Sequence, residues 1–409
     1  MSTIDEELTE AGLPALDRFA WVDVDLDVLT ANASALSASC SPAALGVVVK
    51  ADGYGHGLEA AARCAVSGGA TWLCVATAGE ARRLRTDGYV GRIFVLYSVP
   101  AALLEEMGAL DVDVTVGSID DARSVGVCSA HLGKGLRVHV EIDTGMTRGG
   151  IRPEDAADVV GALGAPVELA GMWTHLSEPE TPDRNRAQLE RFERAVHGVR
   201  REGIDPGVLH VAASGGLAAA EVTSFDVVRI GLGFYGYRPI ANRGPSHEVA
   251  PALAVKAHPV RVAEIPTGTG VGYGSEWVAE RPSTIATIPV GYADGWSRST
   301  FTGGGGAIVG GTRVSIVGHI SSDSMALDVT AAGSVTVDSE VVLLGTQGGQ
   351  SISADDVANT RATISWEVLQ QLSSRLPRVY RTGGRPVAMR GAAGVPLIHG
   401  FDPVLVGPY

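Results

Sequence analysis

The stretch LGVVVKADGYGHG, residues 45–57, determines how the rest of the chain is interpreted. Five apolar or small residues lead directly into Lys50, and a turn with three glycines follows. A continuous apolar run without alternation is typical of a strand buried on both faces in a parallel sheet. Lys50 is one of only three lysines in the chain, so its position at the end of such a strand needs a chemical explanation.

The same pattern recurs along the first 232 residues. Eight strand-length apolar runs alternate with segments whose apolar residues have helical spacing. The runs lie at 45–50, 71–76, 92–97, 112–116, 136–143, 167–175, 208–214 and 225–230. Eight such units favour an α/β fold of the (β/α)8 TIM-type barrel, which we expect to span residues 19–249. A doubly wound open sheet is the alternative, but it has no need of eight strands.

The pattern changes near Ala250. Short alternating strands separated by glycine-rich turns follow, together with one helical stretch near 354–375. We therefore expect a second, mostly β domain at residues 250–390.

Composition and charge exclude several classes of protein. The chain has 409 residues and a formal net charge of −14, which argues against a general affinity for nucleic acid or an acidic membrane surface. The acidic N-terminus lacks the basic and apolar regions of a secretory signal, and no apolar run is long enough to span a bilayer. Four cysteines without metal-ligand spacing fit a reduced compartment. We expect a cytoplasmic protein without a metal site.

Charged and reactive residues gather at the ends of five predicted strands, whereas the strand interiors read as apolar. The strand-end residues are Lys50, then Glu141 and Asp143, His175, the segment from His210 to Ser214, and Arg229. Because the active site of a barrel lies at the carboxyl ends of its strands, we expect these side chains to form one site.

The loops after the last two strands indicate a phosphate. They read SGG (214–216) and GLG (231–233), and glycines there let backbone N–H groups approach a phosphate. A lysine forms imines with carbonyls, and pyridoxal 5′-phosphate supplies both an aldehyde and a phosphate. A class I aldolase, whose lysine binds the substrate itself, is the competing interpretation, but it does not explain Arg229 beside the phosphate loop.

Seven motifs, in this order and spacing, resemble the alanine racemase family of pyridoxal-phosphate enzymes of fold type III. They are VVVKADGYGHG, DTGMTRGG, WTHLSEPE, HVAASGG, VRIGLGFYG, GVGYGSEW and PVGYADGW. The resemblance runs from about Ala20 to Tyr380. It implies an isomerase that interconverts L- and D-alanine, serves D-alanine biosynthesis and forms a homodimer with shared active sites.

The resemblance also implies a role for individual residues. Lys50 would hold the cofactor and act as acid/base on one face of the substrate Cα, and Tyr273 of the partner chain would act on the other. His175 would hydrogen-bond Tyr273 and Arg229, and Arg229 would face the pyridine nitrogen. The remaining implied cofactor contacts are Tyr54, Ser214, Gly231, Leu232 and Trp366, and the substrate contacts are Arg148, Ser322, Tyr273 and Tyr292.

Four positions depart from the family pattern. Glu141 stands where a carbamylated lysine is common, and Trp366 replaces a phosphate-contacting tyrosine. His319 and Ser322 replace an arginine and a methionine near the substrate entry. These changes keep two alternatives open: a racemase or epimerase of another small amino acid in specialised metabolism, and a non-catalytic pyridoxal-phosphate carrier. A decarboxylase would want an acidic partner for the pyridine nitrogen, which Arg229 is not.

Overall fold

The structure, a computed structural model, describes residues 3–213, 225–237, 249–391 and 396–397. These residues form two compact units. The first, here called the barrel unit, comprises residues 28–53 and 58–251. The second, called the β unit, comprises the N-terminal residues up to 27, residues 54–57 and the residues from 252 onward.

Eight parallel strands form the sheet of the barrel unit, in the order β8-β7-β6-β5-β4-β3-β2-β9. They are β2 (Ala44–Val48), β3 (Trp72–Val75), β4 (Arg92–Ser98), β5 (Asp113–Val116), β6 (Arg137–Glu141), β7 (Glu168–Trp173), β8 (Val208–His210) and β9 (Val227–Ile230). The backbone N–H of Arg229 donates to Ala212 O at 2.9 Å, which joins the segment after β8 to β9 and nearly closes the ring. The predicted barrel with its eight strands is confirmed.

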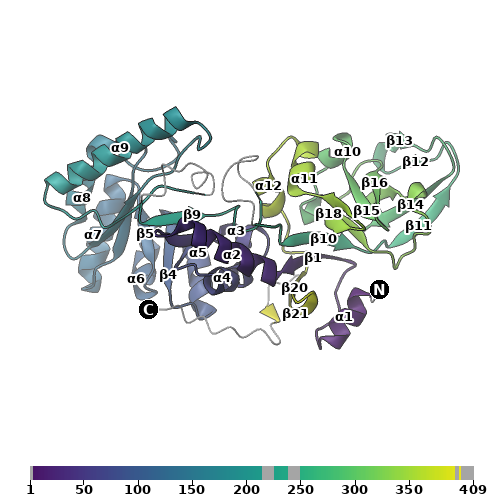
Figure 1. Cartoon of the computed structure of the whole chain (residues 1–409), viewed down its shortest axis with the longest axis horizontal. Helices are drawn as coiled ribbons and strands as arrows, with labels where there is room; N and C mark the ends of the chain where they lie inside the picture. Colours follow the sequence, from purple (N-terminus) through teal and green to yellow (C-terminus); the bar gives the residue numbers. More distant parts are fainter. Residues whose placement is uncertain (1–2, 214–224, 238–248, 392–395, 398–409) are drawn as a thin grey trace. The chain divides into compact units, whose positions relative to one another are not determined.

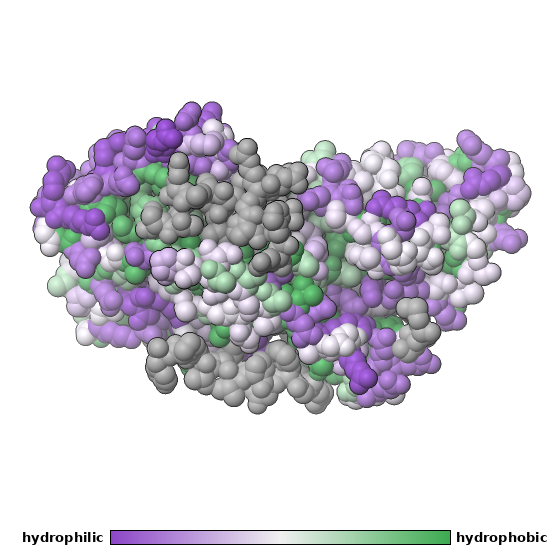
Figure 2. Space-filling model, in the orientation of Figure 1, coloured by the Kyte–Doolittle hydropathy of each residue, from purple (hydrophilic) through white to green (hydrophobic). Residues whose placement is uncertain are grey.

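Helices lie along the outside of these strands (Figure 1). They are α2 (Leu26–Cys40), α4 (Leu58–Ser67), α5 (Ala78–Thr86), α6 (Leu104–Ala109), α7 (Ile119–Leu132), α8 (Ala156–Leu163) and α9 (Pro182–Arg201), with short 3-10 turns at Ala101–Leu103 and Pro153–Asp155. Local sequence fixes their starts: Thr77 and Glu80 form a reciprocal capping box on α5, and Ser118 caps α7. The outward surface over α9 is strongly hydrophilic (Figure 2), as its many charged residues require.

The β unit is built on a twelve-stranded sheet, whose main path is β11-β14-β17-β16-β15-β18-β10-β1-β20-β21-β22, with β19 paired to β18. The strands are β1 (Ala20–Asp25), β10 (Leu253–Ala257), β11 (Arg261–Ile265), β14 (Ser283–Ile288), β15 (Gly306–Val309), β16 (Thr312–Ile316), β17 (Met325–Asp328), β18 (Val341–Gln347), β19 (Gln350–Ile352), β20 (Arg378–Thr382), β21 (Arg385–Arg390) and β22 (Pro396–Leu397). A separate hairpin is made by β12 (Gly270–Val271) and β13 (Trp277–Val278). The mostly β character predicted for this part of the chain is confirmed.

Four α-helices and three 3-10 turns complete the described part of the β unit. They are α1 (Ile4–Glu10), α10 (Ser299–Thr302), α11 (Ala354–Arg361) and α12 (Ser365–Gln370), with turns at Tyr273–Ser275, Tyr292–Asp294 and Thr330–Ala332. The single helical stretch predicted at 354–375 is thus two helices, because Ala362 takes a left-handed conformation that ends α11. Helix α1 buries Ile4 and Leu8 against Trp21, Val379 and Met389.

Strand β1 belongs to the β unit although it precedes the barrel in the chain. It pairs antiparallel with β10 and parallel with β20. The sequence analysis began the barrel domain at residue 19, whereas in the structure the barrel's first strand is β2. Strands that pair across so many residues leave no local pattern in the sequence. An apolar run that precedes a barrel is therefore easily assigned to the barrel.

Candidate active site

Lys50 follows β2 at the start of the short helix α3 (Lys50–Tyr54), whose backbone is unusual. Ala51, Asp52 and Gly53 take φ values of 52°, 54° and 61°. A left-handed conformation costs a residue with a side chain roughly 1–2 kcal/mol. The turn is held by its neighbours: Ala51 N donates to Glu80 Oε1 at 2.7 Å, and Leu58 N donates to Asp52 Oδ1 at 3.2 Å. Such strain persists where function requires a fixed side-chain position, here that of Lys50.

The Lys50 amine lies close to other charged groups at the carboxyl ends of the strands. Its Nζ lies 5.8 Å from the centre of the Tyr97 ring, and Arg148 Cζ lies 5.7 Å from the same centre. Burial and then the Arg148 charge lower the pKa of Lys50, and Glu80 partly offsets them. A lowered pKa leaves a larger fraction of the Lys50 amine unprotonated at neutral pH, and this is the form that acts as a nucleophile or general base.

Glu141 is the last residue of β6, and Arg148 lies in the loop that follows it. Asp143 Oδ1 accepts the N–H groups of Gly145 and Thr147 at 2.9 and 3.0 Å, which folds the loop back. A Cβ at Gly149 would lie 2.9 Å from Glu141 Oε2, so the backbone of the loop passes close to this carboxylate. Burial raises the pKa of Glu141 to about 7, although Arg148 and Arg229 act against it.

His175 lies just beyond β7 in the same charged neighbourhood. Burial, followed by the charges of Arg229, Arg148 and Lys50, lowers the pKa of His175 to about 3. The imidazole is therefore neutral at physiological pH and offers one donor and one acceptor. The charges of Arg229, Arg148 and Lys50 all act on the His175 imidazole, so these side chains lie near one another in the barrel unit.

Arg229 on β9 is buried and rigidly held. Nη1 donates to His210 Nδ1 at 2.8 Å and to His210 O at 2.9 Å, and Nη2 donates to Thr174 O at 2.8 Å and to Val211 O at 3.4 Å. Its guanidinium carbon lies 4.7 Å over the Trp173 ring. Burial lowers the pKa of Arg229 to about 10, so it keeps its charge at neutral pH. None of these four bonds uses Nε, and His175 receives none of them.

The predicted phosphate residues are described only in part. Gly231 and Leu232 are buried and begin a series of turns after β9, in which Tyr235 Oη donates to Val48 O at 3.1 Å. This bond ties the turns to the strand that carries Lys50. Ser214 lies outside the described residues. Tyr54, in the β unit, is buried with a φ of 51°.

Tyr273 is carried by the β12–β13 hairpin of the β unit, and 71% of its side chain is exposed. His319 Nε2 lies 2.9 Å from Glu276 Oε1 on the same hairpin. Gly318, with a φ of 71°, packs so closely that a Cβ would lie 2.4 Å from Val271 O. The 318–319 segment therefore supports the turn that presents Tyr273.

Tyr292 and Ser322 are in contact elsewhere in the β unit. Ser322 Oγ donates to Tyr292 Oη at 2.6 Å, and the backbone N–H groups of Tyr292 and Ala293 donate to Ser321 O and Ser322 O at 3.0 and 2.9 Å. Tyr292 and Arg298 line one hollow of about 560 Å³. Trp366, on α12, is partly exposed.

Comparison with known proteins identifies the family. The model of the alanine racemase N-terminal domain matches residues 24–239, and that of the C-terminal domain matches residues 252–380. The chain belongs to the alanine racemase family. An alanine racemase from Desulfosudis oleivorans is 35% identical over 389 residues, which cover 91% of this chain and 100% of that protein.

Solved structures of alanine racemase relatives share the fold. The alanine racemase of Bacillus anthracis, solved with bound L-Ala-P, superposes with a TM-score of 0.87 at 30% identity and covers 93% of this chain and 99% of its own. A histidine racemase from Leuconostoc mesenteroides subsp. sake superposes with a TM-score of 0.81 at 27% identity, covering 90% and 99%. The resemblance to the alanine racemase family read from the sequence is confirmed.

Sequence reasoning missed Asp113 and His139 inside this alanine racemase-type barrel, and it named His210 only as the start of a strand-end segment. Asp113, His139 and His210 are fully buried, so the expectation that the strand interiors are apolar was wrong. Tyr97, at the end of β4, was also missed, although it lies beside both Lys50 and Arg148. A usable signal existed for the first three: a single aspartate or histidine interrupts each of the apolar runs VDVTV, RVHVE and VLHVA.

Two further findings concern the described part of the chain. None of its helices combines the length and the apolar character that crossing a bilayer requires. In the same ranges, no group of three or more His, Cys, Asp or Glu side chains is arranged to hold a metal ion.

Proposed function

We propose that the protein is a pyridoxal-phosphate-dependent racemase that interconverts L- and D-alanine. The observation that carries this proposal is the half-buried Lys50 amine, with its lowered pKa, among Arg148, His175 and Arg229 in the barrel unit. Membership of the alanine racemase family supports alanine as the substrate. The cytoplasmic location remains a prediction.

The donors of the barrel unit fit the proposed cofactor. Lys50 offers the amine that an aldehyde requires, and the buried turn at Gly231 and Leu232 offers backbone N–H groups suited to a phosphate. Arg229, whose four described bonds use only Nη1 and Nη2, would direct Nε at the pyridine nitrogen. Tyr54, Ser214 and Trp366 remain predictions for the phosphate site. When bound, pyridoxal phosphate supplies the electron withdrawal that acidifies the substrate Cα–H bond.

Racemisation requires two acid/base groups on opposite faces of the substrate Cα. Lys50 Nζ serves one face, and the Tyr273 phenol of a partner copy serves the other. Whichever group removes the proton, the other returns one from the opposite side. Neutral His175 forms a hydrogen bond with the partner's Tyr273, as donor or acceptor, and so tunes the acidity of that phenol. Arg148 holds the substrate carboxylate, and Ser322 and Tyr292 line the approach.

We infer that the active form is a homodimer with shared sites. The strongly exposed Tyr273 on a short hairpin supports this inference, because a catalytic phenol must be desolvated to act and a partner surface can do so. The contact between His319 and Glu276 supports the hairpin, so Tyr273 is already positioned before a partner copy binds.

The test uses the pyridoxal-phosphate-loaded protein with each L-amino acid in heavy water. We expect Cα–H exchange by NMR and D-product by chiral chromatography with alanine. A histidine racemase shares this fold, so histidine and other amino acids belong in the panel. A clear preference for another amino acid would contradict the proposed substrate, and bound cofactor without any exchange would favour a carrier. A Lys50→Ala variant is the control for background exchange.

A further inference from the structure

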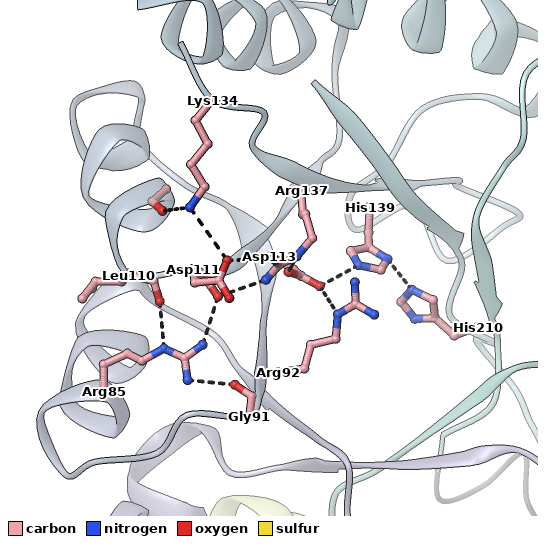
Figure 3. Close-up of polar contacts among 11 residues, drawn as sticks. Arg85, Gly91, Arg92, Leu110, Asp111, Asp113, Lys134, Arg137, His139 and His210 are labelled. Carbon is pink, nitrogen blue, oxygen red and sulfur yellow. Dashed lines mark hydrogen bonds and ion pairs between the residues drawn. The ribbon is translucent and has the colours of Figure 1, made fainter. Parts of the chain in front are cut away.

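A chain of hydrogen-bonded side chains crosses the interior of the barrel unit and ends at Arg229. Asp113 Oδ2 lies 3.2 Å from His139 Nε2, and His139 Nδ1 lies 3.0 Å from His210 Nε2. His210 Nδ1 then lies 2.8 Å from Arg229 Nη1. Figure 3 shows the part from Asp113 to His210, whose residues come from β5, β6 and β8. The chain therefore connects the amino-terminal end of β5 to the cationic site.

The chemistry of its two ends fixes the direction of every hydrogen bond. A guanidinium can only donate, so His210 Nδ1 must accept and the His210 proton sits on Nε2. That proton is donated to His139 Nδ1, which places the His139 proton on Nε2, facing Asp113. Burial is the main cause that lowers the pKa of both histidines, so both rings are neutral. One pair of tautomers satisfies all three contacts.

Two arginines that are not part of this series of hydrogen-bonded side chains keep Asp113 ionised. Arg92 Nε donates to Oδ2 at 2.7 Å, and Arg137 Nε donates to Oδ1 at 2.6 Å. Burial raises the pKa of Asp113, but His139 and the two arginines outweigh it, and the pKa lies below its ordinary value. A carboxylate can only accept hydrogen bonds. Asp113 therefore ends the series of hydrogen-bonded side chains as an acceptor, whereas Arg229 ends it as a donor.

Aromatic rings enclose the two histidines. The Phe94 ring centre lies 4.7 Å from that of His139, and Trp173 stacks on His210 at 6.0 Å with an angle of 7° between the rings. Both histidines are fully buried. With apolar walls around them, the rings depend on each other for hydrogen bonds, and a reversed tautomer would leave a buried donor facing a donor.

We propose that Asp113 is a positioning residue for the reaction, which acts on Arg229 by fixing the tautomers of His139 and His210. This inference rests on the proposed function only in assigning Arg229 to the cofactor. An amide in place of the carboxylate would be able to donate to His139 Nε2. With the NH2 group in the place of Oδ2, where it would also displace Arg92 Nε, both rings reverse and His210 Nδ1–H faces the Arg229 N–H, which breaks the 2.8 Å contact; with the NH2 group in the place of Oδ1 it faces Arg137 Nε instead and the tautomers stay.

The decisive variant is Asp113→Asn, with Asp111→Asn as the matched control. Both aspartates pair with Arg137, whose Nη1 donates to Asp111 Oδ1 at 2.7 Å, and both lie at the start of β5 (Figure 3). Asp113 contacts His139, whereas the side chain of Asp111 is mostly exposed and pairs with Arg137 and Lys134. Comparison of the two variants separates the loss of a carboxylate beside Arg137 from the loss of the acceptor that ends the hydrogen-bonded series.

Two measurements on the pyridoxal-phosphate-loaded protein test the proposal. Nitrogen-15 NMR of labelled histidines should show two Nε2–H tautomers that do not titrate, assigned by loss of signal in histidine variants. Asp113→Asn should change both signals and lower kcat about tenfold, the rate equivalent of one lost hydrogen bond, with a smaller change in KM. Asp111→Asn should change neither. Equal effects of the two variants on kcat, or a lowered kcat in Asp113→Asn without any change of tautomer, would overturn the proposal.

A second pair of variants covers the case in which Asp113→Asn does not fold. The Gln amide of His139→Gln can still donate to Asp113 and accept from His210, whereas His139→Leu can do neither. We expect the glutamine variant to retain the His210 tautomer and most of kcat, and the leucine variant to lose both; the reverse order would contradict the proposal. Wild-type protein with the expected tautomers but without racemisation would contradict the proposed function alone.

Discussion

The two units differ in how they present several of their proposed functional side chains, although Arg148 of the barrel unit is exposed and Tyr54 of the β unit is buried. In the barrel unit Arg229 is 2% exposed and Glu141 is 8% exposed, and their neighbours include buried histidines with internal partners. In the β unit Tyr273 is 71% exposed and Tyr292 is 47% exposed. Buried groups need partners from the same chain, because an unpaired buried charge is costly. The proposed catalytic role of Tyr273 therefore requires a second surface that covers it.

Among the variants that test this comparison of the two units, Tyr273→Phe should have the largest effect. Loss of one acid/base group should lower kcat about 10³-fold. The cofactor absorbance and Tm should stay close to wild type, since this phenol is largely exposed. Steady-state kinetics in both directions, a visible spectrum and a thermal melt measure the three quantities. Unchanged turnover would remove Tyr273 from the reaction and with it the two-face mechanism.

A mixture of inactive Lys50→Ala and Tyr273→Phe chains should regain activity if the sites are shared. Random exchange of subunits leaves about a quarter of the sites with both groups intact. We expect activity to rise toward that fraction of wild type as the chains exchange, followed by a coupled assay. Each variant incubated alone is the control. Heterodimers demonstrated by mass spectrometry without any recovery would show that both groups act from one chain.

Glu141 predicts a pH dependence located in the barrel unit. Its raised pKa of about 7 means that the folded protein binds this proton more tightly than the unfolded chain. The stability contributed by the protonated group is therefore present below the unfolded pKa and is lost as the pH rises through about 7. Glu141→Gln should be more stable than wild type at pH 8 by about 2 kcal/mol, and nearly equal to it at pH 4.

The same carboxylate should affect activity in the opposite sense. We propose that an ionised Glu141 orients Arg148, whose charge acts on it, so wild-type kcat/KM should rise between pH 6 and 8, and Glu141→Gln should be weaker and lack this rise. Melts and pH–rate profiles of the loaded enzyme measure both effects. Activity should not depend on dissolved carbon dioxide, because no carbamate is needed. Identical profiles for the two proteins would exclude Glu141 from the control of Arg148.

Ser322→Ala should give the smallest effect, because the 2.6 Å hydrogen bond between Ser322 Oγ and Tyr292 Oη is exposed. An exposed hydrogen bond contributes little to stability, and we expect less than about 0.5 kcal/mol in a denaturant titration. KM for alanine should change by about threefold or less. Ser322→Met, which restores the side chain common in the family, should alter KM for larger amino acids more than for alanine. Equal changes for all amino acids would argue against a role in side-chain selection.

The sequence was most informative where a local pattern carries the structure. Continuous valine-rich runs predicted every strand of the barrel, and Lys50, His175 and Arg229 were singled out because they stand at predicted strand ends, whereas Arg148 came from the family resemblance. The hydrogen bonds of Arg229 were not predictable, since they depend on which strands close the ring. The tautomer chain was missed for a related reason: Asp113, His139 and His210 are far apart in sequence, and each looks incidental by itself. The exposure of Tyr273 likewise depends on tertiary structure.

The placement of β1 has a consequence for how the chain is made on the ribosome. Strand β1 is synthesised near the start, yet its parallel neighbour β20 begins only at Arg378. At about 5–20 residues per second, β1 must wait on the order of half a minute for that neighbour. The barrel strands, which pair with near neighbours in sequence, have no such delay except between β2 and β9. Nascent chains stalled between residues 257 and 378 should therefore carry β1 paired with β10 on one edge and without β20 on the other, a natural target for chaperones.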